Sequence, residues 1–183
     1  MPVNKQLAIR RLIHGAIRQF AEGEDQLAIH LVAMAAVDTL RGYARSKGKT
    51  FRSATDYVEK GQEGKVLREL KKVYNFLKHS DTDADAILEP NDLSLTNQIV
   101  LIGACLNYIA VFDEATHHMQ AYLAYCSYDL PDFLQDAARE ETMRLPGAHE
   151  LVSMTPAERL GVFKNTLLMP DPVAERRTEL ADG

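Results

Sequence analysis

Residues 71–85 hold the combination of side chains best suited to chemistry: a basic segment that ends at a histidine and continues into alternating aspartates. Asn75 and His79 are four residues apart, as are Tyr74 and Lys78, so in a helix they form two neighbouring stripes that converge at its carboxyl end. The helix dipole and the nearby carboxylates favour a protonated imidazole there. His79 is therefore a candidate general acid or base near neutral pH, with Asn75 and Lys78 beside it.

The same segment has a plainer interpretation and a rival chemical one. Basic side chains at a helix end commonly stabilise exposed carbonyl groups, while acids solvate the loop that follows. Alternatively, Asp81, Asp83 and Asp85 have the spacing of the first ligands in a calcium loop. Against calcium, Ala86 stands at the turn position that requires glycine, and Pro90 interrupts the loop.

Four further histidines can be considered as possible ligands of a transition metal. His117 and His118 are adjacent, so on a helix they point about 100° apart and do not easily share one ion. We expect them on a partly exposed helix surface. His14 and His30 lie among apolar positions, which is typical of core or boundary histidines.

Asp38 is the other acidic residue of interest, because it interrupts an otherwise apolar helical segment and therefore needs a partner. Arg41 and Arg45 follow on the same segment, so a simple salt bridge is the alternative to a functional role. Four tyrosines in the second half are expected to pack against neighbouring helices: Tyr108, Tyr122, Tyr125 and Tyr128.

The elements that must position these residues are helices, because apolar residues recur at three- and four-residue spacing through nearly the whole chain. The pattern predicts helices over residues 4–21, from about 24 towards 48, a short one after 53, 63–79, one long helix from 94 to about 126, 131–143, and one after the start signal at 153–158. We therefore expect an all-α fold. Residues 1–128 should form an antiparallel bundle, and residues 129–183 an acidic helical extension packed on it or flanking it.

The charge of the chain is divided along its length. Residues 1–80 carry 15 Lys and Arg against 8 Asp and Glu, a balance of +7, whereas residues 81–183 carry 6 against 18, a balance of −12. Such a division either creates an electropositive face for a polyanion or is neutralised within the fold. Lys71, Lys72 and Lys78 are the candidate contacts to nucleic-acid phosphates.

Composition also bears on the compartment. Residues 1–18 lack the apolar block of a secretory signal, and the most apolar run, residues 99–112, is too short to cross a bilayer. The chain has two cysteines, which do not suggest a disulfide framework. These features predict a cytoplasmic protein without membrane association.

The order of these parts resembles the HEPN (higher eukaryotes and prokaryotes nucleotide-binding) superfamily of small helical bundles. Two features carry the resemblance: the small-residue, acid-bearing helix at residues 28–40, and the sequence Tyr-Asn-Phe-Leu-Lys-His at residues 74–79, which ends the next helix. The chain is especially similar to a group of bacterial helical proteins whose third helix ends in Asn-x-x-Lys-His followed by acids. The resemblance covers roughly residues 5–126 and implies a homodimer.

Nuclease members of this superfamily cleave RNA without metal, using an Arg, a polar residue and, after a few spacers, a His. The resemblance assigns the histidine to His79, the polar position to Asn75, and an acidic residue of the second helix to Asp38. Lys78 or Lys72 would then contact phosphate, but as a point charge without the planar fork of arginine. None of the three possible places for the motif's arginine holds one: they are Tyr74, Val73 and Lys72.

Three functions follow from these patterns. The missing arginine favours a non-catalytic or weakly catalytic module that binds RNA, a nucleotide or a cognate protein partner, and that needs no cofactor. The first alternative is a metal-independent endoribonuclease of a defence or toxin–antitoxin type that uses His79. The second is a metal-binding helical protein that uses the acidic loop at residues 79–92.

Overall fold

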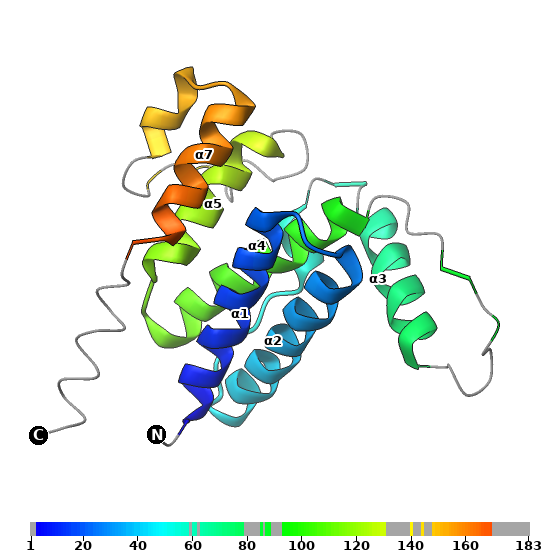
Figure 1. Ribbon diagram of the computed structural model, residues 1–183. Coiled ribbons are helices and arrows are strands. Elements are labelled where there is room, and N and C mark those ends of the chain that lie inside the picture. Colours follow the sequence, from blue (N-terminus) through cyan, green and yellow to red (C-terminus); the bar gives the residue numbers. More distant parts are fainter. Residues whose placement is uncertain are drawn as a thin grey trace, which may run out of the picture.

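The computed structural model of this protein describes residues 3–58, 60–61, 63–78, 85, 87–88, 93–130, 140, 144 and 148–169. These residues form helices and connecting segments with no strand, so the predicted all-α fold is confirmed (Figure 1). The elements are α1 (Lys5–Glu22), α2 (Gln26–Ser46), the 3-10 helix η1 (Ala54–Tyr57), α3 (Glu63–Lys78), α4 (Leu93–Phe112), α5 (His117–Asp129), the 3-10 helix η2 (Ala148–Ser153) and α7 (Pro156–Leu167).

Local capping explains where the first two helices begin and end. The side chain of Asn4 accepts the N–H of Leu7 at 2.8 Å, which satisfies one of the free donors at the start of α1. Gly23 ends the helix in the left-handed conformation, with φ of 70°. Asp25 then caps α2 by accepting the N–H groups of Leu27 and Ala28. The three-residue connection folds α1 and α2 into a hairpin.

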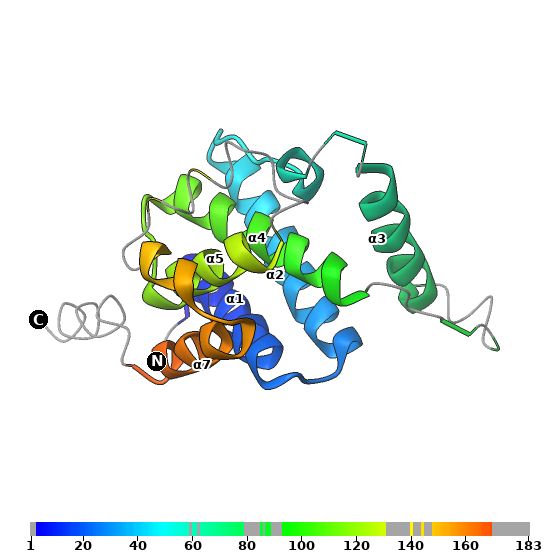
Figure 2. The ribbon, with the colours of Figure 1, turned by 90° about the horizontal axis from the view of Figure 1, so that it is seen from above.

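The hairpin is one part of a bundle in which most helices share a core. Helix α2 packs on α4, and α1 also contacts α4, α5 and α7. Helix α3 packs on α4 and η1 and lies at the edge of the bundle in both views (Figures 1 and 2). The segment that carries the strongest sequence signal therefore occupies the periphery of the fold.

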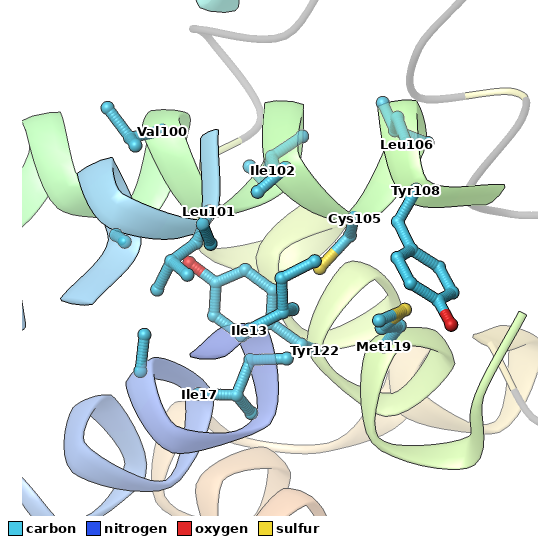
Figure 3. Close-up of a cluster of buried hydrophobic side chains, with 14 of the residues drawn as sticks. Ile13, Ile17, Val100, Leu101, Ile102, Cys105, Leu106, Tyr108, Met119 and Tyr122 are labelled. Atoms are coloured by element: carbon cyan, nitrogen blue, oxygen red, sulfur yellow. The ribbon is translucent and has the colours of Figure 1, made fainter. Parts of the chain in front are cut away.

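Helix α4 forms the centre of the core because it is apolar on nearly all sides. Leu101, Cys105 and Tyr108 are fully buried on it. Tyr122 of α5 lies between α4 and α1 (Figure 3), and its hydroxyl donates to the carbonyl oxygen of Gln98 at 3.2 Å. Burial of this kind is worth about 1.5–3 kcal/mol for each large apolar side chain.

The predicted long helix over residues 94–126 is wrong: the chain forms two helices, α4 and α5. Asp113 adopts φ of 53°, a left-handed conformation that aspartate tolerates better than most residues, and thereby ends α4. Thr116 then caps α5, its hydroxyl accepting the N–H of Met119 at 3.3 Å. The break turns α5 back so that both helices pack against α1.

The extension contributes α7, which begins at its predicted start signal. Thr155 and Glu158 form a capping box, and Pro156 occupies the first helical turn. Phe163 of α7 is 2% exposed and stacks on Tyr125 of α5, with ring centroids 5.1 Å apart. Helix α7 thus packs on α5 and α1, while the predicted helix at residues 131–143 lies mostly outside the described residues.

The tyrosines of the second half and both cysteines pack in the core or against it. The four tyrosines pack as predicted: Tyr108 and Tyr122 are buried, Tyr125 contacts Phe163, and Tyr128 lies under Arg159, whose guanidinium carbon is 5.5 Å from the ring centroid. Both cysteines are free and buried, and burial raises the pKa of the Cys105 and Cys126 thiols.

Two helices, α2 and α4, are long and apolar enough to cross a membrane by length and composition alone. In α4, 78% of the most apolar window is buried inside the bundle, which is typical of a soluble protein's core helix. In α2 the buried share is 39%, because one face of this helix is on the surface. Localisation in the cytoplasm stays a prediction.

Candidate functional site

Most of the site predicted at the end of α3 lies beyond what the structure describes. His79, Asp81 and Asp83 are outside the described residues, and Asp85 is exposed in a turn. Lys72 is exposed on α3. For three further predicted residues the helix is described but the side chains are not: Lys71, Asn75 and Lys78. Their grouping around His79 stays a prediction.

Asp38 is placed clearly, on the exposed face of α2. Its Oδ1 lies 3.2 Å from Nη1 of Arg41, so the salt bridge considered from sequence is present. The two side chains are 59% and 50% exposed. An exposed pair of this kind contributes about 0.2–1 kcal/mol to stability and leaves Arg41 open to solvent.

Arg41 also belongs to a surface hollow of about 510 Å³, here called the cationic hollow. Its described lining residues are Arg41, Arg45, Lys49, Phe51 and Ser53. The arginines are one helical turn apart on α2, and both are exposed. The described lining therefore combines three cations, an aromatic ring and a hydroxyl, and the carboxylate of Asp38, which pairs with Arg41, is not among these residues.

The turn after α2 brings Lys49 beside the two arginines. Gly48 adopts φ of 63°, and the N–H groups of Gly48 and Lys49 donate to the carbonyl oxygens of Arg45 and Ala44. This Schellman motif reverses the chain at the helix end. The Lys49 ammonium donates to the carbonyl oxygen of Val111, near the end of α4, and two of its three N–H groups remain for another acceptor.

The strip of chain that carries Phe51 is held by Asn107, a polar residue buried in the apolar helix α4. Asn107 Oδ1 accepts the N–H of Arg52 at 2.8 Å, and its Nδ2 donates to the carbonyl oxygen of the same residue at 2.9 Å. The guanidinium of Arg41 lies over the Phe51 ring, 5.3 Å from its centroid. The hollow is thus positioned by the carboxyl end of α2 and by α4, rather than by a free loop.

A second group of polar residues, the α1 polar stripe, is buried instead. It consists of Gln6, Arg10 and His14, which share one face of α1. Arg10 Nη1 lies 3.4 Å from Glu114 Oε1, with both side chains 10% exposed or less. The same carboxylate accepts the hydroxyl of Tyr108 at 2.9 Å and the Gln6 amide at 3.1 Å.

His14 continues this stripe, and its ring packs against the ring of His118. His14 Nε2 is 2.8 Å from the Thr116 hydroxyl, and the His14 and His118 rings are 4.6 Å apart. His118 is 7% exposed, so the expectation of a partly exposed surface is wrong for it; α5 turns its face towards α1. Burial, with smaller contributions from His118, Arg10 and Arg18, lowers the pKa of His14 to about 3.

These histidines serve the fold. A base with its pKa near 3, enclosed between two helices, does not exchange protons with a substrate near neutral pH. His30 is similarly buried, and its Nδ1 is 2.8 Å from Asn97 Oδ1. The prediction that His14 and His30 are core histidines is confirmed. No group of three or more potential metal ligands occurs among the described residues, and the acidic loop lies largely outside them.

Sequence reasoning missed the cationic hollow although its signal was present. Arg41, Arg45 and Lys49 recur every four residues and are followed by Phe51. Spacing alone pairs the two arginines with Asp38. It does not predict the turn at Gly48, which keeps Lys49 on the same side.

Comparison with protein-family models, with curated proteins and with solved structures finds no match for this chain.

Proposed function

We propose that this protein is a HEPN-like helical module that binds RNA or nucleotides through their phosphate groups at the cationic hollow, without having to cleave them. The observation that carries the proposal is the convergence of Arg41, Arg45 and Lys49 on one hollow, with no carboxylate among its described lining residues. Guanidinium groups bind phosphate through paired N–H donors, and an ammonium adds a compact charge.

The surroundings of the hollow support a polyanionic ligand. The first 80 residues, which contain the whole described lining of the hollow, carry the positive balance of the chain. Phe51 offers an aromatic surface next to the cations, which suits a nucleobase attached to the bound phosphate. A purely inorganic anion would need the cations but not the ring.

The chemistry of the lining favours binding over catalysis. Arginine and lysine side chains stay protonated at neutral pH, and neither a phenyl ring nor a serine hydroxyl alone accepts a proton there. The HEPN resemblance points the same way, because the motif's arginine is missing. Cleavage, if present, would have to come from His79.

The direct test measures binding of a labelled single-stranded RNA in EDTA by fluorescence anisotropy. The paired substitution Arg41→Glu with Arg45→Glu is expected to weaken binding at least tenfold. The matched control is Arg11→Glu with Arg18→Glu, which changes the net charge equally on the exposed face of α1. Equal losses in both pairs would contradict a specific hollow and leave only a general charge effect.

Salt dependence provides a second readout. Three phosphate contacts on a single strand predict an affinity loss of about 20-fold between 50 and 200 mM salt. The paired hollow variant should lose most of that dependence.

The same samples decide between binding and cleavage. We expect the RNA to remain intact with the wild-type protein and with His79→Ala, and to be retained by both. Cleavage by the wild type that His79→Ala abolishes would overturn the non-catalytic part of the proposal and identify His79 as the catalytic residue.

A further inference from the structure

We propose that a second hollow, between α5, η2 and α7, binds a small organic amine with an apolar body. This α5–α7 pocket has a volume of about 320 Å³ and shares no lining residue with the cationic hollow. That volume falls at the lower end of the range for small-molecule sites. The inference is independent of RNA binding.

The body of the pocket is apolar and preformed. Phe163 and Tyr125 stack nearly in parallel, at 17°, and form one wall. Ala121 and Ala124 on α5 leave space because their side chains end at Cβ, and Leu151 of η2, itself 7% exposed, contributes on the other side. Such walls favour a flat or compact hydrocarbon group, which gains about 25 cal/mol for each Å² of apolar surface that it buries.

One carboxylate lies among the described lining residues of the pocket. Glu150 is exposed and is the only Asp, Glu, Lys or Arg among them, and His117 adds an imidazole. The nearest cations along α7 have other partners: Lys164 lies 3.5 Å from Glu22, and Arg159 donates to the carbonyl oxygen of Met154 at 2.5 Å. No salt bridge of Glu150 occurs within the described part of the chain.

These observations define the ligand by complementarity. An apolar body fits between Tyr125, Phe163 and Leu151, and an ammonium group reaches Glu150. A carboxylate ligand of equal shape would meet Glu150 with like charge.

The test uses three probes of similar shape: 2-phenylethylamine, phenylacetate and ethylbenzene, titrated against the full chain by ligand-detected NMR. We expect the amine to bind about tenfold more tightly than phenylacetate, with ethylbenzene between them. Glu150→Gln should bring the amine and the anion to similar affinities, whereas Glu24→Gln, an exposed carboxylate on the α1–α2 turn, should change neither.

Variants that fill the pocket with a larger side chain provide the second part of the test. Ala121→Leu should abolish binding of all three probes while the circular dichroism spectrum stays that of the wild type. If this variant fails to fold, Thr166→Leu at the half-buried edge of the pocket takes its place. Absence of amine binding to the wild type at millimolar concentration, equal binding of amine and anion, or undiminished binding by the filled variant would each overturn the proposal.

Discussion

Helices α1 and α2 both carry basic side chains four residues apart, yet one pair is buried and the other is exposed. Arg10 and His14 on α1 are buried, and each meets a partner from the segment around α5. Arg41 and Arg45 on α2 are exposed beside a hollow whose described lining includes no acid, and the salt bridge of Arg41 with Asp38 is itself exposed. The same spacing thus serves the fold in one helix and is available to a ligand in the other.

What distinguishes the two pairs is the element that faces them. The α4–α5 connection contributes Glu114 and Thr116 to the α1 polar stripe, and a buried cation requires such acceptors. The cationic hollow faces a strip of chain at residues 49–53 that adds a further cation and a ring. Whether a basic pair stabilises the fold or is available to a ligand therefore depends on the elements that face it, and not on the spacing of the pair itself.

The largest expected effect comes from breaking the buried pair. Glu114→Ala leaves the Arg10 guanidinium buried without its carboxylate, which should lower the free energy of unfolding by about 3–5 kcal/mol. Urea denaturation at pH 7 measures the change. Glu114→Gln keeps an acceptor for Tyr108 and should cost less. A loss below about 1 kcal/mol for Glu114→Ala would show that the pair behaves like a surface salt bridge.

The pH dependence of stability should report the buried histidine. His14 has a pKa of about 3 in the fold against 6.5 when unfolded, so the unfolded state binds the additional proton between these values. The contribution is fully present above pH 6.5 and is lost as the pH falls, by at most about 1.4 kcal/mol for each pH unit. Comparing unfolding at pH 7 and pH 5 measures it.

Replacement of the histidine provides the control for this prediction. His14→Gln retains a polar group near Thr116 but cannot take up a proton, so its stability should fall less between pH 7 and pH 5. His117→Gln, on the half-exposed side of α5, should leave the wild-type difference unchanged. Identical pH profiles for the wild type and His14→Gln would contradict the assignment.

Two buried amides on α4 allow the hollow to be perturbed without touching its charges. Asn107→Leu removes both bonds to the backbone of Arg52 and should cost about 1–3 kcal/mol of stability. It should also weaken RNA binding, because the strip of chain that carries Phe51 loses its fixed position. Asn97→Leu removes bonds to Gln26 and His30 instead. It should destabilise the protein to a similar extent while RNA affinity is unchanged once folding is complete.

The smallest effect should come from Asp38→Ala. Its exposed salt bridge with Arg41 predicts a stability change of at most about 1 kcal/mol. RNA affinity should rise slightly, because Arg41 loses a competing anion. A marked loss of binding or of RNA cleavage would instead indicate that Asp38 orients the site, as the HEPN resemblance implies.

The helices were predictable because their signals are local. Apolar periodicity and capping residues such as Thr155 mark a helix within a few residues, so α1, α2, α3 and α7 lie close to their expected positions. The break between α4 and α5 was not, because it depends on one left-handed residue, Asp113, between two segments that both have helical spacing. The spacing of apolar residues is judged over several helical turns, so a single residue of this kind hardly changes it.

The two hollows and the buried stripe depend on contacts that sequence spacing does not encode. Whether His118 is exposed depends on the direction in which α5 leaves the break, and the α5–α7 pocket depends on where α7 docks. The cationic hollow could be predicted in part from the sequence, because its cations recur every four residues. Recognising it required knowing that Asp38 pairs with Arg41 alone among these cations and that the turn at Gly48 brings Lys49 beside the arginines.

The α1 polar stripe also sets an order of events on the ribosome. Its hydrogen bonds join residues 102 to 108 positions apart, whereas the α1–α2 hairpin is complete by residue 46. At typical synthesis rates residue 118 is added roughly 4–14 s after residue 46. Throughout that interval the nascent chain lacks Glu114 and Thr116, the partners of Arg10 and His14 in the finished fold. The α1 polar stripe is therefore a late contact of synthesis, whereas the α1–α2 hairpin needs only residues that are made early.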